Sequence, residues 1–224
     1  MKPGLRESLR AGSQLALAGL AAAVLLAGTW VLTRDRIAES ERQAQLQALE
    51  IVLPAPRYDN DPIADGVRVL APAWLGQPEA RVFRARLGGE PSALVFESTA
   101  PDGYAGPIRL LVAVDPSGTV LGVRVTGHQE TPGLGDDIEA ARSDWIRGFG
   151  GRSLADPVRR RWRVQREGGY FPQFAGATLT PRAVVAAVRR TLDFEAAHGD
   201  ALRAAEAGAT LSFDDAPTDP PPAR

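Results

Sequence analysis

The fold is decided by the stretch Ile108-Arg-Leu-Leu-Val-Ala-Val114, Asp115-Pro-Ser-Gly118, Thr119-Val-Leu-Gly-Val-Arg-Val125. Two apolar segments flank a tetrapeptide that has Asp first, Pro second and Gly fourth, which are the residues a type I turn prefers. This pattern predicts an antiparallel hairpin. Just upstream, segments 82–87 and 93–97 flank Gly88-Gly89 and predict a second hairpin.

Helices are predicted on the C-terminal side of these hairpins. A helix is expected from Asp137 to about Phe149, and a longer one from Pro181, with Thr180 as its N-cap. The longer helix has one apolar stripe, formed by Val184, Val185, Val188 and Leu192. The predicted fold class is therefore α+β, with a twisted antiparallel sheet packed by helices.

The N-terminal region predicts a membrane anchor. Residues 11–33 carry no charge, and a helix of that length covers about 35 Å, whereas a bilayer core is roughly 30 Å thick. A cleaved signal peptide is the alternative. Against it, the apolar stretch is long for such a peptide and no small-x-small cleavage site follows it.

Charges around this segment predict its orientation. Lys2, Arg6 and Arg10 precede it and are opposed only by Glu7, so the N-terminus is expected in the cytoplasm and the remaining chain on the far side. A stalk helix is predicted over 37–53, ended by prolines. From about Ser212 the chain is rich in Pro and Asp and is expected to be disordered.

Composition excludes several classes of function. The 224 residues include 26 Lys+Arg and 27 Asp+Glu, so there is no basic excess for binding nucleic acid. Cysteine is absent, which removes disulfides, thiolate metal sites, iron–sulfur ligation and Cys nucleophiles. Only His128 and His198 are available as imidazole ligands, which argues against a protein-built zinc or haem site. An electron carrier of this composition would need a bound organic cofactor.

The first candidate site is the segment 175–181, Ala-Gly-Ala-Thr-Leu-Thr-Pro, directly before the longer predicted helix. Its small residues let a bulky group approach the backbone, and the helix start offers unpaired N–H groups and a positive dipole end. Both suit a phosphate. The same residues also fit a small turn that only caps a helix.

The second candidate site is the glycine-punctuated loop from His128 to Asp136. Its glycines permit positive φ, and Glu130 and Thr131 could donate or accept hydrogen bonds around a planar ligand. A plain surface turn fits as well, with His128 as a hydrogen-bonding loop residue. The acidic pairs 136–137 and 214–215 are expected to be solvated. The aromatic residues are expected in the core or against a cofactor: Trp145, Trp162, Tyr170, Phe171 and Phe174.

Taken in order, several segments closely resemble the G subunit of the Rnf (Rsx) electron-transport complex. They are residues 99–104, 118–122, 128–135 and 176–181, together with the anchor, the stalk at 33–39 and the segment 143–146. The resemblance covers roughly residues 10–195. The C-type flavin subunit of the sodium-pumping NADH:quinone reductase shares the flavin-site pattern, but the match to Rnf is closer.

This resemblance implies a flavoprotein with a single membrane-spanning helix, held in the bacterial inner membrane with its main domain in the periplasm. It implies one FMN, esterified through its phosphate to Thr178 by a separate flavin transferase. The expected flavin-site residues are Gly176, Ala177, Thr178, Leu179 and Thr180, together with His128, Glu130, Thr131, Leu134 and Gly135. The FMN would pass electrons within a multi-subunit complex that couples ferredoxin and NAD redox chemistry to ion transport.

The implied organisation is a cytoplasmic segment 1–10, a membrane helix 11–33, a stalk 34–75, an FMN-binding domain 76–195 and a C-terminal extension 196–224. The sequence shows no arrangement of acid and base residues that would indicate a free-standing enzyme. Two positions depart from the family: Ala175 stands where Ser or Thr is usual, and Pro172 where an acidic residue is usual. These departures leave open a scaffold subunit without flavin.

Overall fold

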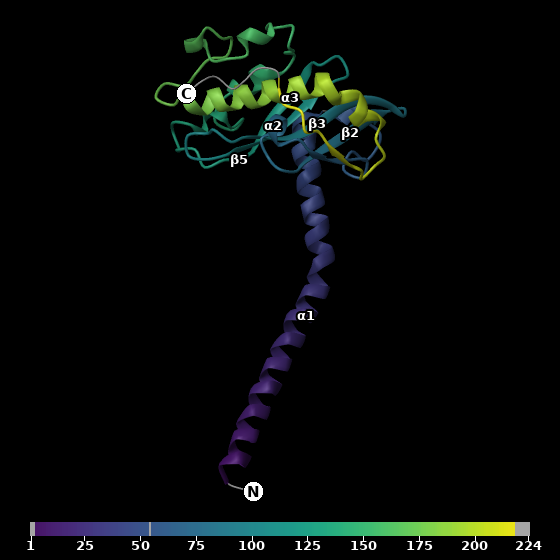
Figure 1. The fold of residues 1–224 in the computed structure, drawn as a ribbon, viewed down its shortest axis with the longest axis vertical. Helices are drawn as coiled ribbons and strands as arrows, with labels where there is room; N and C mark the ends of the chain where they lie inside the picture. The colour runs from purple at the N-terminus through teal and green to yellow at the C-terminus, as the bar shows by residue number, and fades with distance from the viewer. Residues whose placement is uncertain (1–2, 54, 218–224) are drawn as a thin grey trace. The chain divides into compact units, whose positions relative to one another are not determined.

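The computed structural model describes residues 3–53 and 55–217, and it divides into a unit up to Leu46 and a unit from Gln47 onward (Figure 1). The described residues of the N-terminal unit belong to helix α1 (Pro3–Val52). Within it, Gln14–Arg34 has a mean hydropathy of 2.2, and none of these residues is buried. The segment is thus long and apolar enough to span a membrane, which agrees with the predicted N-terminal apolar helix.

The second unit is built on a six-stranded sheet with the order β5-β4-β3-β2-β1-β6. Its strands are β1 (Val67–Leu70), β2 (Ala80–Leu87), β3 (Glu90–Ala100), β4 (Ile108–Val114), β5 (Val120–Gly127) and β6 (Thr210–Ser212). Both predicted hairpins are present, as β2–β3 and β4–β5. The turn between β4 and β5 is closed by Asp115, whose Oδ1 accepts the backbone N–H groups of Ser117 (2.9 Å) and Thr119 (3.0 Å).

One strand pair departs from the expected antiparallel pattern. Strand β6 pairs in parallel with β1, with Val69 opposite Leu211. The sheet therefore extends on both sides beyond the 76–195 boundary expected for the FMN-binding domain. The predicted disorder from Ser212 is wrong up to Asp215, because Phe213 packs against His198 (ring centroids 4.3 Å apart) and Asp215 accepts a hydrogen bond from Trp74 Nε1 (3.2 Å). Of the rest of that prediction, residues 218–224 lie outside the described residues.

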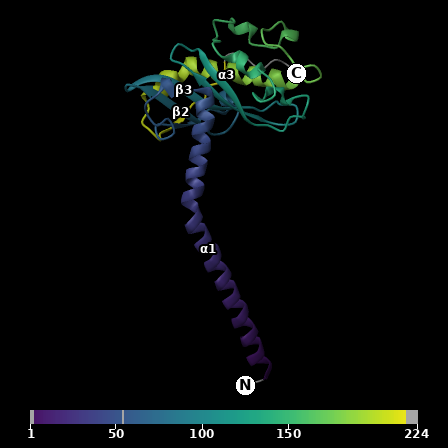
Figure 2. The ribbon, with the colours of Figure 1, turned by 180° about the vertical axis from the view of Figure 1, so that it is seen from behind.

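The long helix α3 (Leu179–Ala204) crosses one face of the sheet, as Figures 1 and 2 show. Its apolar stripe is buried there as predicted, and burial of each such side chain stabilises the fold by roughly 1.5–3 kcal/mol. The stripe and strands share one core: Val184, Val188, Leu192, Phe194, Phe96, Leu110 and Val112. The opposite face has a smaller core that includes Leu49, Val52 and Leu53 from the end of α1 with Phe83 and Val95.

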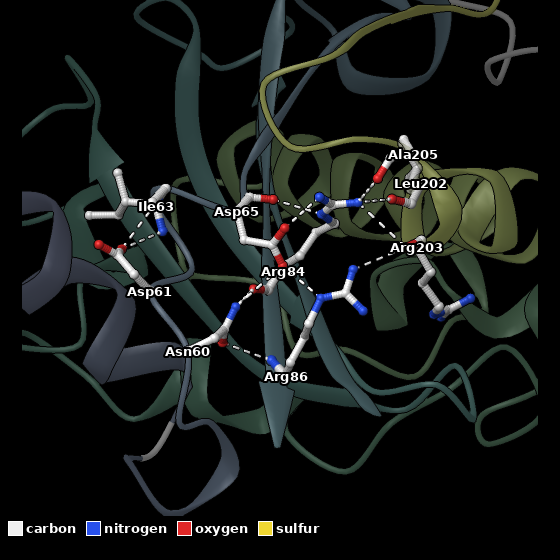
Figure 3. A network of polar contacts seen from close by, with 10 residues as sticks. Asn60, Asp61, Ile63, Asp65, Arg84, Arg86, Leu202, Arg203 and Ala205 are labelled. Atoms are coloured by element: carbon white, nitrogen blue, oxygen red, sulfur yellow. Dashed lines mark hydrogen bonds and ion pairs between the residues drawn. The ribbon is translucent and has the colours of Figure 1, made fainter. Parts of the chain in front are cut away.

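A buried arginine secures the C-terminal end of α3 (Figure 3). Arg84 on β2 is 3% exposed, and its Nη1 donates to the carbonyl oxygens of Leu202 (3.2 Å) and Arg203 (3.4 Å). Its Nη2 pairs with Asp65 at 2.5 Å, and Arg86 Nε pairs with the other Asp65 oxygen at 2.7 Å. Cations at a helix C-terminus complement its negative dipole end. This cluster therefore fixes the end of the helix whose start carries the first candidate site.

The predicted helix from Asp137 to Phe149 is wrong. That stretch forms two short 3₁₀ helices, η2 (Asp136–Ile138) and η3 (Trp145–Phe149), separated by turns. Glu139 takes an extended backbone and ends the first, and the hydroxyl of Ser143 donates to the carbonyl of Asp137 (2.7 Å). The remaining short elements are η1 (Ala55–Arg57), α2 (Pro72–Leu75), η4 (Arg159–Arg161) and η5 (Gln165–Glu167).

Candidate functional site

The first candidate site lies where α3 begins. The helix starts at Leu179, so Thr178 occupies the N-cap position, with φ −77° and ψ −30°. Its side chain makes no capping hydrogen bond, and the residue is half-buried. The hydroxyl of Thr178 is therefore not used to hold the helix, although it stands beside the unpaired N–H groups of the first turn.

Thr180 is not the N-cap that the sequence predicted. It lies inside the first turn and is fully buried, and its hydroxyl donates to Oε2 of Glu130. The prediction failed because this tertiary partner takes the hydroxyl away from the helix backbone. Pro181 is tolerated in the first turn because an N–H there has no intrahelical acceptor.

Glu130 joins three segments of the chain. It is 4% exposed, and its Oε1 accepts the backbone N–H of Ala105 at 3.0 Å. Its own backbone N–H donates to Nδ1 of His128 (3.0 Å), and Nε2 of His128 lies 2.7 Å from Oε1 of Glu139. Glu130 thus connects its own loop to the loop after β3 and to the start of α3.

Two glycines make this close packing possible. A Cβ on Gly135 would lie 2.9 Å from Oε2 of Glu130 and 3.1 Å from Oγ1 of Thr180. A Cβ on Gly103 would clash with the carbonyl oxygen of Gly106 and would lie 2.9 Å from Oε1 of Glu130. Any side chain at either position would push the carboxylate away from its partners.

The second candidate loop is closed by its own hydrogen bonds. The carbonyl of Thr131 accepts the N–H groups of Leu134 (3.1 Å) and Gly135 (3.0 Å). Asp136 accepts the N–H of Gly133 at 2.7 Å and pairs with Arg142 at 3.4 Å. Asp136 is buried at 5% exposure, so the expectation that it is solvated is wrong. Its carboxylate is needed inside the turn.

The two candidate segments meet at Leu134 and Gly176. A Cβ on Gly176 would be in ordinary contact, 3.5 Å, with Cδ2 of Leu134. Gly176 has φ +81°, a conformation that glycine adopts without strain. Leu134 and Leu179 are 47% and 45% exposed, while Ala175 and Gly176 are also exposed. The arrangement combines a free hydroxyl, a helix N-terminus and exposed apolar side chains, and it can hold a phosphate next to a flat apolar group.

The aromatic residues divide between two roles. Trp162 and Phe171 are buried in the main core, at 1% and 2% exposure. Trp145 is only half-buried, lies 5.1 Å from Phe174 between ring centroids, and donates from Nε1 to the carbonyl of Pro172 at 2.8 Å. Trp145 and Phe174 therefore support the segment that precedes Thr178.

Sequence reasoning missed two contributors to the site. One is the loop at 103–106, whose paired glycines were the available signal. The other is the ion pair between Glu167 and Arg182. Arg182 is in α3, about one helical turn after Thr178. No spacing rule connects Glu167 to that turn. Searched over 3–53 and 55–217, the structure shows no cluster of three metal-ligating side chains.

Two family models match this chain and define the class of protein to which it belongs. The family model for the FMN-binding domain matches residues 103–193, which contain both candidate segments. The family model for the RnfG N-terminal region matches residues 1–52. The class is thus a protein with an N-terminal apolar helix and an FMN-binding domain.

Similar proteins of known name identify the particular family within this class. The G subunit of the ion-translocating oxidoreductase complex of Pseudomonas aeruginosa (strain UCBPP-PA14) is 47% identical over 205 residues, covering 91% of this chain and 96% of the relative. The protein of the same name from Cereibacter sphaeroides (strain ATCC 17029) is 50% identical over 184 residues, covering 82% of each chain. That from Cronobacter sakazakii is 52% identical over 159 residues, covering 71% of this chain and 76% of the relative. The chain belongs to the RnfG family, the G subunits of Rnf-type ion-translocating oxidoreductase complexes.

Proposed function

We propose that this protein transfers electrons through one FMN attached by its phosphate to the hydroxyl of Thr178. The observation that carries the proposal is the state of that hydroxyl, which stands at the start of α3 without a capping bond. In this proposal the complex couples ferredoxin- and NAD-linked electron transfer to ion transport. When bound, FMN supplies the redox chemistry, and the chain supplies position and surroundings.

Thr178 is favoured over Thr180 on access and bonding. Thr180 is fully buried and its hydroxyl is held by Glu130, whereas Thr178 is half-buried and uncapped. A transferase must reach the oxygen that it modifies, and the exposed Ala175 and Gly176 leave the approach to Thr178 open. The hydrogen bond to Glu130 holds Thr180, which is two residues after Thr178, and so fixes the backbone next to the proposed attachment point.

The helix start suits the linkage electrostatically. A phosphodiester keeps one negative charge, and a helix N-terminus stabilises such a charge by roughly 0.3–1 kcal/mol. Arg182 lies four residues after Thr178 on the same helix face, and long helical side chains point back toward the N-terminus. The exposed side chains of Leu134 and Leu179 would pack against a flat apolar ring at this position.

The membrane arrangement is also part of the proposal. The charges before the apolar segment support a cytoplasmic N-terminus and a periplasmic domain in a single-pass inner-membrane protein. A covalent bond would retain the cofactor on that side of the membrane. A separate flavin transferase is the proposed maturation partner, and the other subunits of the complex are the proposed assembly partners.

The test is the intact mass of the full chain after co-expression with its cognate flavin transferase. The expected gain is the mass of FMN less one water, mapped to the peptide that contains Thr178. Thr178→Ala should abolish the gain, and Thr178→Ser, which keeps a hydroxyl, should retain it. Covalent FMN in Thr178→Ala would contradict the assignment.

A second candidate function is a scaffold subunit without covalent flavin. Ala175 and Pro172 favour it, because the family usually has Ser or Thr and an acid at those positions. A colourless, unmodified chain that still co-purifies with the complex would support this alternative. A yellow colour lost on denaturation would indicate FMN bound without a covalent bond. The matches to the RnfG family favour both candidates over a component like the C-type flavin subunit of the sodium-pumping reductase.

A further inference from the structure

A short segment before α3 carries an unusual excess of positive charge. Residues 157–166, hereafter the arginine segment, contain Arg159, Arg160, Arg161, Arg163 and Arg166 and no acidic residue. The chain after Arg34 has a formal charge of −4, and without these ten residues it would be −9. The arginine segment therefore carries five positive charges with no acidic residue among them, whereas the rest of the chain after Arg34 is net negative.

Most of the arginines of this segment form no ion pair within the described part of the protein. Arg159 pairs with Asp193, with Nε 2.7 Å from one oxygen and Nη2 3.0 Å from the other. The side chains of the other four arginines are exposed. Over the part of the chain that the structure describes, no carboxylate forms an ion pair with any of those four, Arg160, Arg161, Arg163 and Arg166. Clustered like charges oppose the compact state, so folding does not explain them.

The backbone of the arginine segment is nevertheless firmly held. Trp162 is buried, and its Nε1 donates to the carbonyls of Ser153 and Pro157, both at 3.0 Å. Val164 is fully buried. Gly169 packs so closely that a Cβ there would clash with the carbonyl oxygen of Arg163. The inward Trp162 and Val164 alternate with outward arginines, which are thus presented from a fixed framework.

The arginine segment is tied to the candidate flavin site. The backbone N–H of Arg166 donates to Oε1 of Gln173 (3.2 Å), which is two residues before Ala175. The next residue, Glu167, forms an ion pair with the side chain of Arg182. The backbone N–H of Arg182 donates to the carbonyl oxygen of Thr178, with the nitrogen and oxygen 3.3 Å apart. Figures 1 and 2 show the green segment that precedes α3 on the α3 side of the sheet.

We propose that the arginine segment is a docking surface for an acidic protein that comes to the Thr178 site. That the docked protein exchanges electrons with FMN at Thr178 rests on the proposed function, whereas the docking itself does not require the flavin. Arginine forks bind carboxylates with two parallel hydrogen bonds. Complementary charge at such a surface raises the association rate and makes it sensitive to salt. Redox encounters use small interfaces, which four exposed arginines beside the site can serve.

A protein partner fits the arginine segment better than a lipid surface. Segments that lie in a membrane interface combine basic residues with exposed Trp, Phe or Leu that enter the acyl region. In the arginine segment Trp162 is turned inward and buried, and the single exposed large apolar side chain is Val158 (46% exposed), beside the four exposed arginines. Such a surface matches an array of carboxylates.

The test exploits the scarcity of lysine, since Lys2 is the single lysine of the chain. The variant R160K/R161K/R163K keeps the charge and adds three amines. A carbodiimide then joins each amine to a contacting Asp or Glu as an amide with loss of water. The matched control, R57K/R68K/R81K, changes three exposed arginines outside the arginine segment. Both variants are treated in native membranes that contain the assembled complex, and cross-linked peptides are identified by mass spectrometry.

The expected result is cross-links from positions 160, 161 and 163 to carboxylates of another protein, lost at high salt and not given by the control. In R160E/R161E/R163E, the association rate of the partner so identified should fall about tenfold or more. Cross-links no more frequent than in the control would overturn the proposal. So would R160E/R161E/R163E losing affinity for phosphatidylglycerol vesicles while no protein cross-link forms. Repeating the cross-linking with Thr178→Ala separates docking from flavin attachment, because docking should persist in the unmodified chain.

Discussion

The hydroxyl of Thr180 donates a hydrogen bond to Oε2 of Glu130, a residue 50 positions earlier in the chain, and both side chains are buried. This bond joins the loop after β5 to the first turn of α3. Since Thr178 is only two residues from Thr180, the same bond holds the proposed flavin attachment point in register with Leu134. Glu130 acts as a structural tie here, because each of its carboxylate oxygens has a partner within the protein.

Thr180→Val removes the hydroxyl and keeps the shape of the side chain. The buried carboxylate of Glu130 then loses a donor, and we expect a loss of about 1–3 kcal/mol in the free energy of unfolding. Urea unfolding of the full chain in detergent measures this. Thr126→Val, at an exposed position on β5, should change the free energy by no more than about 0.5 kcal/mol. Equal effects would show that Glu130 does not depend on Thr180.

Ala175→Thr restores a hydroxyl next to Gly176 at an exposed position. Because the resemblance to the family implies Ser or Thr at this position, we expect faster transfer of FMN to Thr178 by the cognate transferase in this variant. The fraction of modified chain against time, read by intact mass, measures the rate. Ala207→Thr, which adds the same side chain at an exposed position outside both candidate segments, is the control. An unchanged rate would show that the transferase does not use position 175.

Glu195 predicts a specific dependence of stability on pH. Burial raises the pKa of its carboxyl above the ordinary 4.5, while the hydrogen bond from Arg203 and its charge lower it in part. The folded state therefore holds this proton more tightly than the unfolded state does. Stability from this group is present at low pH and is lost as pH rises from about 4.5 through the raised pKa.

Glu195→Gln should flatten that slope, because glutamine does not titrate. Unfolding free energies of the full chain in detergent, measured at several pH values from about 4.5 upward, give the slope. Glu90→Gln, at an exposed position on β3, should leave it as in the unaltered chain. A slope that persists in Glu195→Gln would assign the titration to another group.

Arg84→Ala should be among the most damaging single changes in the domain. It removes the guanidinium that bonds the carbonyls at the end of α3 and leaves Asp65 without its closest partner. Breaking a buried ion pair from one side costs about 3–5 kcal/mol. Arg81→Ala, an exposed arginine on the same strand, should cost little. Thermal unfolding of both variants, compared at equal detergent, measures the difference.

What the sequence predicted well was local. The β4–β5 hairpin follows from four adjacent turn residues, and Asp115 makes the bonds that this pattern requires. The apolar stripe of α3 follows from its spacing. In each case the deciding contacts lie within a few residues, so propensity and periodicity are sufficient.

What the sequence did not predict depends on distant partners. The start of α3 moved because Thr180 bonds to Glu130 rather than to the helix backbone. In the stretch 137–149 the backbone turns at Glu139, and the hydroxyl of Ser143 bonds to the carbonyl of Asp137, which apolar spacing does not reveal. At the candidate site, the segments were predicted, whereas their meeting at Leu134 and Gly176 needed the structure.

The parallel pairing of β6 with β1 has a consequence for biogenesis. Strand β1 precedes its partner strand, Thr210–Ser212, in the chain and is therefore synthesised before it. Any chain cut before Thr210 leaves β1 as an uncovered edge, and such edges recruit strands from other molecules. Strand β6 therefore covers that edge of β1, and we expect proteolytic removal of β6 to increase self-association of the domain.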